Sequence, residues 1–492
     1  MTMTPAAIAA NRFGLGMRGD GAAVGDPKAY LLRQLEMFDP RPAALKDVPT
    51  RADVADTLVQ FYVQKKAEKR AQTVAATASL ALPPAPTPTQ TPAAPQAKSP
   101  RSPELKQARD DVRDLYISSI GTRLNAALIT PAPFVERLVH FWANHFAISV
   151  DKPPVTAFAG LLEFEAIRPN VLGRFVDMLH AVEQHPAMLI YLDQVQSIGP
   201  DSVMGQRRAA NAKAKSGLNE NLAREIMELH TLGVRSGYTQ TDVTEFARAM
   251  TGWFVTGLVP GGPDQKRGVA GAPGEAVFRD NQHEPGSRVI LGRTYNQPGA
   301  AQSLAILDDL ATHPATARHI ATKLARHFTG DTPAPSLVNK LTTTFKATNG
   351  HLPSVYRVLI EAPECWAPAP VKFKTPWDWS VSSLRALNLT TVDPKPFSGT
   401  MIALGQQIWK PGSPAGYDDL DASWAAPDAL LRRVDIAQRL AQRTGGGIDA
   451  RTLAKVVFQG SASPATEQAL GNAESGTQAL ALLFASPEFM RR

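Results

Sequence analysis

Apolar residues recur at intervals of three or four positions along most of the chain, which is the spacing of helices that bury one face. The densest such pattern runs over residues 217–253, and its first half predicts a helix with an apolar stripe of Leu218, Leu222, Ile226, Leu229 and Gly233. Gly233 is placed to end this helix, because glycine readily adopts the left-handed conformation found at helix C-termini. Thr239, with Asp242 three residues later, predicts the N-cap of a second helix. We therefore expect a helix, a short loop and a second helix.

The same spacing predicts helices through most of the remaining chain, including residues 27–37, 51–72, 134–148 and 155–192. About eight more helices are expected after residue 300, separated by glycine and proline. Two short β-branched or aromatic stretches, residues 276–279 and 288–291, flank turn-forming residues and predict one small hairpin. The predicted fold is therefore mainly α, a large multi-helix single domain with one small β-hairpin.

The segment at residues 73–103 departs from this helical pattern. It is rich in alanine, proline and threonine and of low complexity, so we expect a disordered Ala/Pro-rich insertion. Helical spacing resumes at residue 104. The predicted organisation is residues 1–72 as the N-terminal helices of the main domain, residues 73–103 as the insertion, and residues 104–492 as the main helical domain.

Composition limits the classes of function. The 492-residue chain is 43% apolar, which is enough for a substantial core. Its 52 basic and 45 acidic side chains leave a net charge of +7, which favours an anionic partner only slightly. Because no fold signature of a nucleic-acid-binding protein is visible, nucleic acid is not expected as a partner. The single cysteine, Cys365, excludes an intramolecular disulfide framework and a cysteine-based zinc site.

Targeting and nucleotide-binding signatures are not visible either. The first residues lack a basic region followed by a sustained apolar run, so they predict no secretory signal peptide. No run approaches about 18 apolar residues, so no transmembrane helix is expected. These two observations predict a cytoplasmic location by default. The glycine-rich fingerprints of nucleotide sites are absent, so no nucleotide cofactor is expected.

Histidine and glutamate side chains are the candidates for chemistry. Glu225 and His230 lie on the central helix, but they are five residues apart and point in different directions. A site shared with His145, on the helix at 134–148, requires the two helices to face each other. His283, in the predicted hairpin turn, is a further candidate. These groups could act as catalytic acids and bases or hold a divalent metal of unknown identity. The alternative is a set of structural hydrogen bonds in the core.

Two basic residues precede the central helix. Arg207 and Arg208 lie in a polar segment, residues 194–216, that leads into the helix N-terminus. Free backbone N–H groups and the helix dipole favour anions at such a place, so the two arginines are candidates for an anion-binding site. A solvated loop is the alternative interpretation.

The central stretch, GLNENLAREIMELHTLGV followed by GYTQTDVTEFARAMTGW, resembles the signature of a bacterial family catalogued as domain of unknown function 1800. Further segments resemble that family in the same order, namely RLVHFWANHFAIS (137–149), HEPG with ILGRTY (283–295), HPATARHIATKLARHF (313–328) and KFKTPWDWSVSSLRAL (372–387). The resemblance covers nearly the whole chain apart from the insertion. It implies no established activity.

The resemblance also implies a candidate partner. Members of the family often occur beside a second uncharacterised family, domain of unknown function 1501, whose proteins tend to carry export signals. A periplasmic or envelope-associated location is therefore the alternative to the cytoplasm.

Two classes of function remain open at this point. The first is an enzyme-like or polymer-handling accessory protein with a polar His/Glu site on the central helices. The second is a non-catalytic helical scaffold that acts with a partner of the family catalogued as domain of unknown function 1501. A bound metal would favour the first, and a stable metal-free complex would favour the second.

Overall fold

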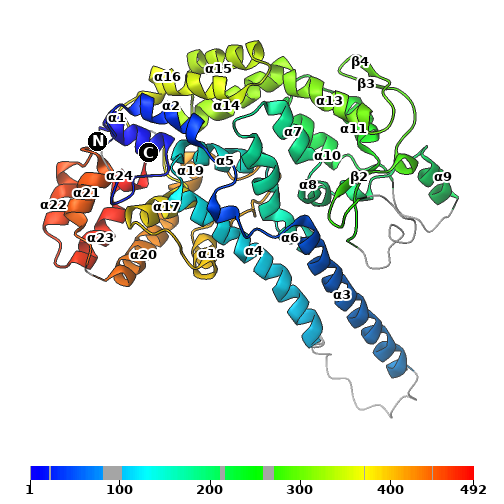
Figure 1. Ribbon diagram of the computed structural model, residues 1–492, viewed down its shortest axis with the longest axis horizontal. Helices are drawn as coiled ribbons and strands as arrows, with labels where there is room; N and C mark the ends of the chain where they lie inside the picture. The colour runs from blue at the N-terminus through cyan, green and yellow to red at the C-terminus, as the bar shows by residue number, and fades with distance from the viewer. Residues whose placement is uncertain are drawn as a thin grey trace, which may run out of the picture.

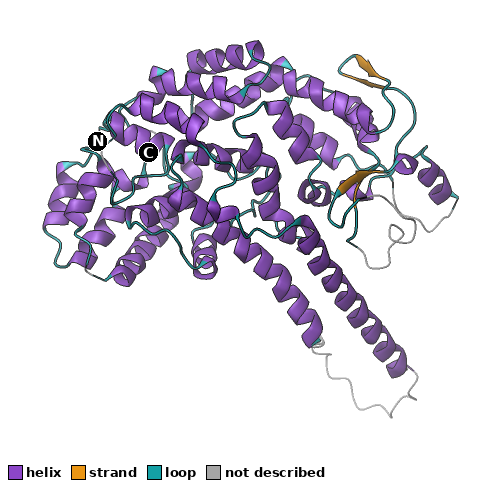
Figure 2. Cartoon of the chain, in the orientation of Figure 1, coloured by secondary structure: helices purple, strands orange, loops and turns teal. Residues whose placement is uncertain are grey.

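The computed structural model describes residues 2–21, 24–80, 102–210, 217–258, 271–370, 372–445 and 447–492. Within these ranges the chain is mainly helical, as predicted, and its strands are confined to two small antiparallel pairs (Figure 2). None of the helices in the described ranges combines the length and the apolar character needed to cross a bilayer.

Helices of the first half lead into the strands. In chain order they are α1 (Pro5–Ala7), α2 (Pro27–Met37), α3 (Arg51–Leu80), α4 (Pro103–Ile129), α5 (Pro133–His145), α6 (Pro153–Leu161), α7 (Phe175–Glu183), α8 (Pro186–Tyr191), α9 (Val203–Ala209), α10 (Asn221–Glu225) and α11 (Gln240–Met250). The strands are β1 (Trp253–Val255), β2 (Ala276–Phe278), β3 (Arg288–Ile290) and β4 (Arg293–Tyr295).

Helices of the second half follow the strands. They are α13 (Ala300–Thr312), α14 (Pro314–Thr329), α15 (Pro335–Ala347), α16 (Leu352–Glu361), α17 (Pro376–Ala386), α18 (Pro394–Ala403), α19 (Asp421–Trp424), α20 (Pro427–Thr444), α21 (Ala450–Phe458), α22 (Pro464–Gly471), α23 (Gly476–Ala485) and α24 (Pro487–Met490). Many of these helices begin with proline, which suits a first helical position because no N–H is required there.

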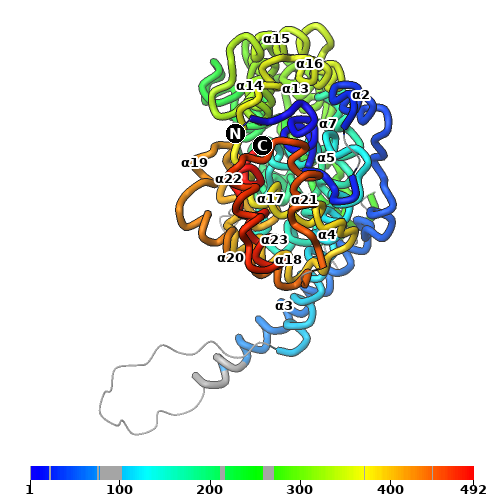
Figure 3. The backbone as a smooth tube through the Cα atoms, turned by 90° about the vertical axis from the view of Figure 1, so that its left-hand side faces the viewer, coloured from blue at the N-terminus to red at the C-terminus, as the bar shows by residue number. Residues whose placement is uncertain are grey.

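Helices α3 and α4 lie side by side and project together from the body of the molecule (Figures 1 and 3). The expectation that residue 73 begins an extended segment is wrong in its first part, since α3 continues to Leu80. Residues 73–80 contain three alanines and no proline, so nothing in them breaks a helix. The remainder of the predicted insertion, residues 81–101, lies outside the described residues. Ser102 then caps α4, its Oγ accepting from the N–H of Leu105 at 3.2 Å.

The prediction of one hairpin from residues 276–279 and 288–291 is wrong. Strand β2 pairs with β1, with Phe278 opposite Trp253, and β3 pairs with β4. The segment between β2 and β3 cannot act as a hairpin turn because it is fastened to the end of α11. The backbone N–H of Glu284 donates to the Thr251 hydroxyl at 2.8 Å.

The central helix–loop–helix unit forms as predicted. Helix α10 continues as a π-helical turn, Ile226–His230, and α11 follows after Gly233, whose φ is 91°. Thr239 caps α11 in a reciprocal pair with Asp242. The predicted apolar residues of α11 are buried: Val243, Phe246, Ala247 and Met250.

Helix α17 separates two hydrophobic clusters. Its Trp377 packs in the main core, whose buried residues run from Met3 to Trp409, whereas its Trp379 packs in a smaller cluster with the C-terminal helices α20 to α24. Every residue of α17 is buried. Polar side chains that this helix carries, such as Asp378, must therefore be paired inside the protein.

Candidate functional site

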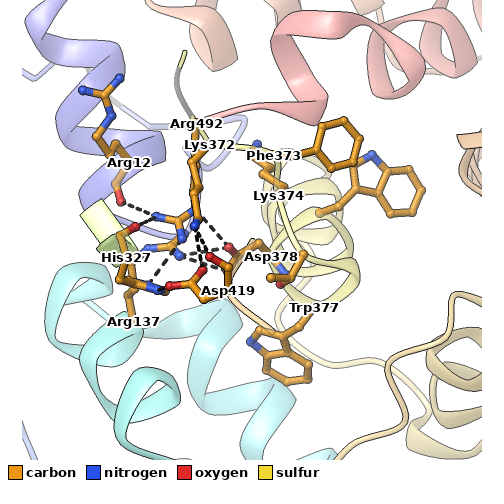
Figure 4. Close-up of polar contacts among 12 residues, drawn as sticks. Arg12, Arg137, His327, Lys372, Phe373, Lys374, Trp377, Asp378, Asp419 and Arg492 are labelled. Carbon is orange, nitrogen blue, oxygen red and sulfur yellow. Dashed lines mark hydrogen bonds and ion pairs between the residues drawn. The ribbon is translucent and has the colours of Figure 1, made fainter. Parts of the chain in front are cut away.

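A pocket with a volume of about 320 Å³ lies between α5, α14, the start of α17 and residues 401–419. Aromatic, aliphatic and uncharged polar side chains form much of its wall, and charged side chains form the rest. The charged part is organised around two aspartates, the buried Asp378 and the half-buried Asp419, and the cations that surround them (Figure 4).

Helix α14 contributes one complete wall of the pocket. Its apolar stripe of Ile320, Leu324 and Phe328 faces the core and is fully buried. The residues between these positions point to another side of the helix, because successive positions differ by about 100°. The side chains that α14 presents to the pocket are His319, Lys323, Arg326 and His327.

Asp419 holds His327 in place. One carboxylate oxygen of Asp419 lies 2.9 Å from His327 Nδ1, and the other lies 3.2 Å from Lys372 Nζ. Burial would raise the pKa of the Asp419 carboxyl, but His327 and Lys372 outweigh it and hold that pKa well below its usual range. Asp419 is therefore a carboxylate at neutral pH, and the proton of the His327 ring is fixed on Nδ1.

Asp378 is the second carboxylate of this region, and two arginines bind it. Arg137 Nη1 lies 3.0 and 3.1 Å from its two oxygens, and Arg492 Nε lies 3.2 Å from one of them. Burial would raise the pKa of Asp378, but the two guanidinium groups hold it at about 2. Arg492 also lies between Asp378 and His327, with Nη2 3.4 Å from His327 Nε2 (Figure 4).

Lys323 and Arg326 differ from the other cations of the pocket. Among the described residues, no side chain or carbonyl forms a hydrogen bond or an ion pair with Lys323, and Arg326 Nε is buried without a hydrogen-bond partner. Burial lowers the pKa of Lys323 to about 8. A cation that lacks a protein partner in a pocket is available to an anionic ligand.

The aromatic part of the wall is built around Arg123. Its guanidinium lies 4.4 Å from the ring centre of Trp377 and 5.4 Å from that of Trp409. Its Nε also lies 3.1 Å from Glu163, to which the Trp409 indole N–H donates at 3.0 Å. These contacts fix both tryptophan rings, since each ring is held by a cation and by its own packing.

The outer edge of the pocket is held by Asn144. Its side-chain amide donates to the carbonyl of Tyr417 at 2.8 Å and accepts from the N–H of Tyr417 at 2.8 Å. Gly416 precedes Tyr417 with φ of 84°, and a Cβ at that position would lie 2.3 Å from the Asn144 carbonyl oxygen. Only glycine allows this close approach.

The structure brings together two of the histidines singled out in the sequence. His145 lines the pocket, and its ring centre lies 6.2 Å from that of His230. His145 Nε2 donates to the carbonyl of His230 at 3.1 Å, and His230 Nδ1 lies 2.7 Å from Glu183. Burial, with smaller effects of Lys323 and His319, holds the pKa of His145 well below its usual value. His230 and Glu183 are fully buried behind the pocket wall.

The other sequence candidates do not line the pocket. Glu225 is half-buried on α10, where burial raises its pKa. His283 Nδ1 lies 3.0 Å from the carbonyl of Thr251, near β2. Arg207 and Arg208 lie in the last turn of α9, and part of the segment that links them to α10, residues 211–216, lies outside the described residues.

No group of three or more His, Cys, Asp or Glu side chains in the described ranges is arranged to hold a metal ion. The polar residues of the pocket that sequence reasoning did not select include Arg137, Lys323, Arg326, His327, Asp378 and Asp419. The one signal that points to them is the polar face of α14, where His319, Lys323, Arg326 and His327 alternate with the apolar stripe.

These features define a class: a mainly helical protein whose pocket holds two ion-paired aspartates and two cations that have no hydrogen-bond or ion-pair partner among the described residues. No curated protein and no solved structure matches the chain. The chain belongs to the family described as Protein of unknown function (DUF1800), whose model matches residues 8–491. The family match confirms the resemblance seen in the central stretch, and it includes every residue of the pocket.

Proposed function

We propose that the protein is enzyme-like and that its pocket binds a small anionic substrate, or the anionic end of a larger one, and carries out acid/base chemistry on it. The observation that carries this proposal is the pair of unpartnered cations, Lys323 and Arg326, on one wall of the pocket. The other charged side chains of that region that we have described already have protein partners, so these two are the groups that a ligand would neutralise.

His327 supplies the acid/base group in this proposal. Because Asp419 fixes the ring proton on Nδ1, the lone pair of His327 is on Nε2. Burial lowers the pKa of His327 to about 4, so the ring is neutral at pH 7 and able to accept a proton. Arg492 Nη2 donates to Nε2 at 3.4 Å, so a ligand must displace this long contact before His327 accepts its proton.

The central helix unit has a supporting role in this proposal. His230 lies behind the wall and binds His145 through its backbone carbonyl, while Glu183 fixes the ring of His230. The unit therefore positions His145 in the pocket. A role for Glu225 or His283 in catalysis has no support from pocket geometry.

Calorimetric titration with inorganic phosphate, acetate, pyruvate and succinate tests the proposal. We expect at least one of these anions to bind. Lys323→Met and Arg326→Met should each weaken the binding of that anion by about tenfold or more, which corresponds to about 1.4 kcal/mol of binding free energy. Arg318→Met is the matched control, since Arg318 lies on the same helix but is exposed to solvent. The proposal fails if none of the anions binds, or if the pocket variants bind as tightly as the control.

A second function, a scaffold acting with a partner of the family catalogued as domain of unknown function 1501, is favoured by a different observation. The outer parts of α3 and α4 extend away from the body (Figure 1), and most of the side chains described there are exposed. Co-expression with such a partner, followed by size-exclusion chromatography, tests this function. Charge reversal at Lys65 and Lys69 on α3 should weaken a complex that uses this pair of helices, whereas Arg318→Glu should not.

A further inference from the structure

Three lysines surround the charged part of the pocket, and their environments differ. Lys372 Nζ lies 3.2 Å from Asp331 and 3.2 Å from Asp419, so it is neutralised by two carboxylates. Lys374 Nζ donates to the Ser382 hydroxyl at 3.2 Å and lies 4.3 Å from the ring centre of Phe489, behind the wall. Lys323 alone among the three lines the pocket without a hydrogen-bond or ion-pair partner in the described residues.

The surroundings of Lys323 favour an uncharged amine. Arg326 follows it by three residues and lines the same pocket, so a second cation is on the same side of α14. The side chain is half-buried in the pocket wall, and burial lowers its pKa to about 8 although Asp419 acts in the opposite direction. Withdrawal from water and a neighbouring cation are the two conditions under which a lysine becomes a nucleophile.

We propose that Lys323 forms an imine with a small ligand that carries an aldehyde or ketone beside an anionic group, such as a 2-oxo acid, and that Arg326 binds the anionic group. This inference rests on the proposed function, because it specifies which anions the pocket would accept. Arginine suits the anionic group, since its guanidinium matches the geometry of a carboxylate.

The step needs no oxidant or reductant. The lone pair of Lys323 Nζ forms a bond to the carbonyl carbon, the carbon–oxygen π bond breaks, and one of the two Nζ protons passes to the oxygen, so that a neutral carbinolamine forms. The resulting carbinolamine loses its hydroxyl group, with one more proton, as a molecule of water. A protonated imine remains, whose positive charge withdraws electrons from the adjacent carbon. His327, one helical turn after Lys323 and also in the pocket wall, is the group that exchanges these protons.

Reduction with sodium borohydride in the presence of pyruvate tests the imine directly. We expect the intact protein to gain the mass of one reduced ligand, and peptide mapping to place it on Lys323. Acetone, which has the carbonyl but no charge, should label the protein at least tenfold less under the same conditions. Lys323→Met should abolish labelling, and Arg326→Met should reduce it by tenfold or more with pyruvate but not with acetone.

Lys346→Met is the matched control, because Lys346 lies on the neighbouring helix α15 and is exposed. It should label like the wild type. Lys323→Arg keeps the positive charge, so it distinguishes the loss of the nucleophile from the loss of the folded structure. This variant should bind pyruvate in calorimetry without being labelled. Labelling spread over surface lysines and unchanged in Lys323→Met overturns the inference. Pyruvate binding that depends on Arg326 but gives no adduct also overturns it, while leaving the proposed function intact.

Discussion

His327 Nδ1 lies 2.9 Å from a carboxylate oxygen of Asp419, although 92 residues separate the two in the chain. Asp419→Asn removes the charge that both His327 and Lys372 face, so we expect a loss of roughly 1–3 kcal/mol in the free energy of unfolding. Urea denaturation measures this. Asp418→Asn, at the exposed neighbouring position, should leave stability unchanged within about 0.5 kcal/mol. Equal effects of the two substitutions would contradict the role assigned to Asp419.

The same substitution should change the protonation of His327. In the wild type, Asp419 raises the pKa of His327, although burial prevails and lowers it to about 4. Without the carboxylate, His327 should stay neutral to a still lower pH, and its proton should no longer be confined to Nδ1. Nitrogen NMR of the histidine rings measures both. A His327 signal that titrates at the same pH in Asp419→Asn and in the wild type would disprove the assignment.

Buried histidines should make the protein sensitive to mild acid. Burial lowers the pKa of His319 and of His327 to about 4, whereas an unfolded histidine titrates near about 6.5. Between these values the unfolded chain binds protons that the folded protein does not, so stability should fall as pH decreases from about 6.5 to about 4. Each group contributes about 1.4 kcal/mol per pH unit across that window. His319→Gln should reduce the slope, and an unchanged slope in urea denaturation between pH 7 and 4.5 would count against this account.

The ion pair between Arg123 and Glu163 should show strong coupling. Arg123→Met leaves the buried Glu163 with a single donor, the indole of Trp409, so we expect a loss of about 3–5 kcal/mol. In the double variant Arg123→Met/Glu163→Gln no charge is left unpaired, and we expect most of that loss to be recovered. A double-mutant cycle measured by chemical denaturation gives the coupling directly. Additive effects of the two substitutions would show that the pair is not a unit.

Gly416 and Gly405 offer a comparison of steric and conformational effects. Their φ angles are 84° and 83°, so alanine suffers similar backbone strain at both positions. A Cβ at 416 would lie 2.3 Å from the Asn144 carbonyl oxygen, whereas a Cβ at 405 has no atom within 4 Å. Gly416→Ala should therefore cost roughly 1–3 kcal/mol more than Gly405→Ala. Thermal unfolding measures the difference, and equal losses would show that the contact with Asn144 relaxes without cost.

Periodicity predicted the elements of this fold better than it predicted their contacts. The stripe of Val243, Phe246 and Met250 is buried as expected, because a helix with one apolar face has only one side that can face a core. The hairpin failed because β-branched residues indicate a strand but not its partner. Strand β2 pairs with β1, and the segment after β2 is bound to the end of α11 through Glu284 and Thr251, contacts that no spacing predicts.

The pocket was only partly predictable for the same reason. His145 and His230 were selected as polar residues beside apolar stripes, and the two helices do face each other. Asp378 and Asp419 carry no pattern of their own, since their importance comes from the arginines and the lysine that other segments bring to them. The spacing of residues in a sequence describes one helix at a time, whereas a buried ion pair joins side chains from two separate segments of the chain.

The order in which the chain is made has a consequence for the pocket. Arg137 and Asp378 are 241 residues apart, and Asn144 and Tyr417 are 273 residues apart. At about 5–20 residues per second, a ribosome needs roughly 12–55 s to bridge such intervals. During that time Arg137 of α5 has no Asp378 to pair with, and Asn144 has no Tyr417. The pocket is thus a late product of biosynthesis, and no partial chain that ends before Tyr417 contains it.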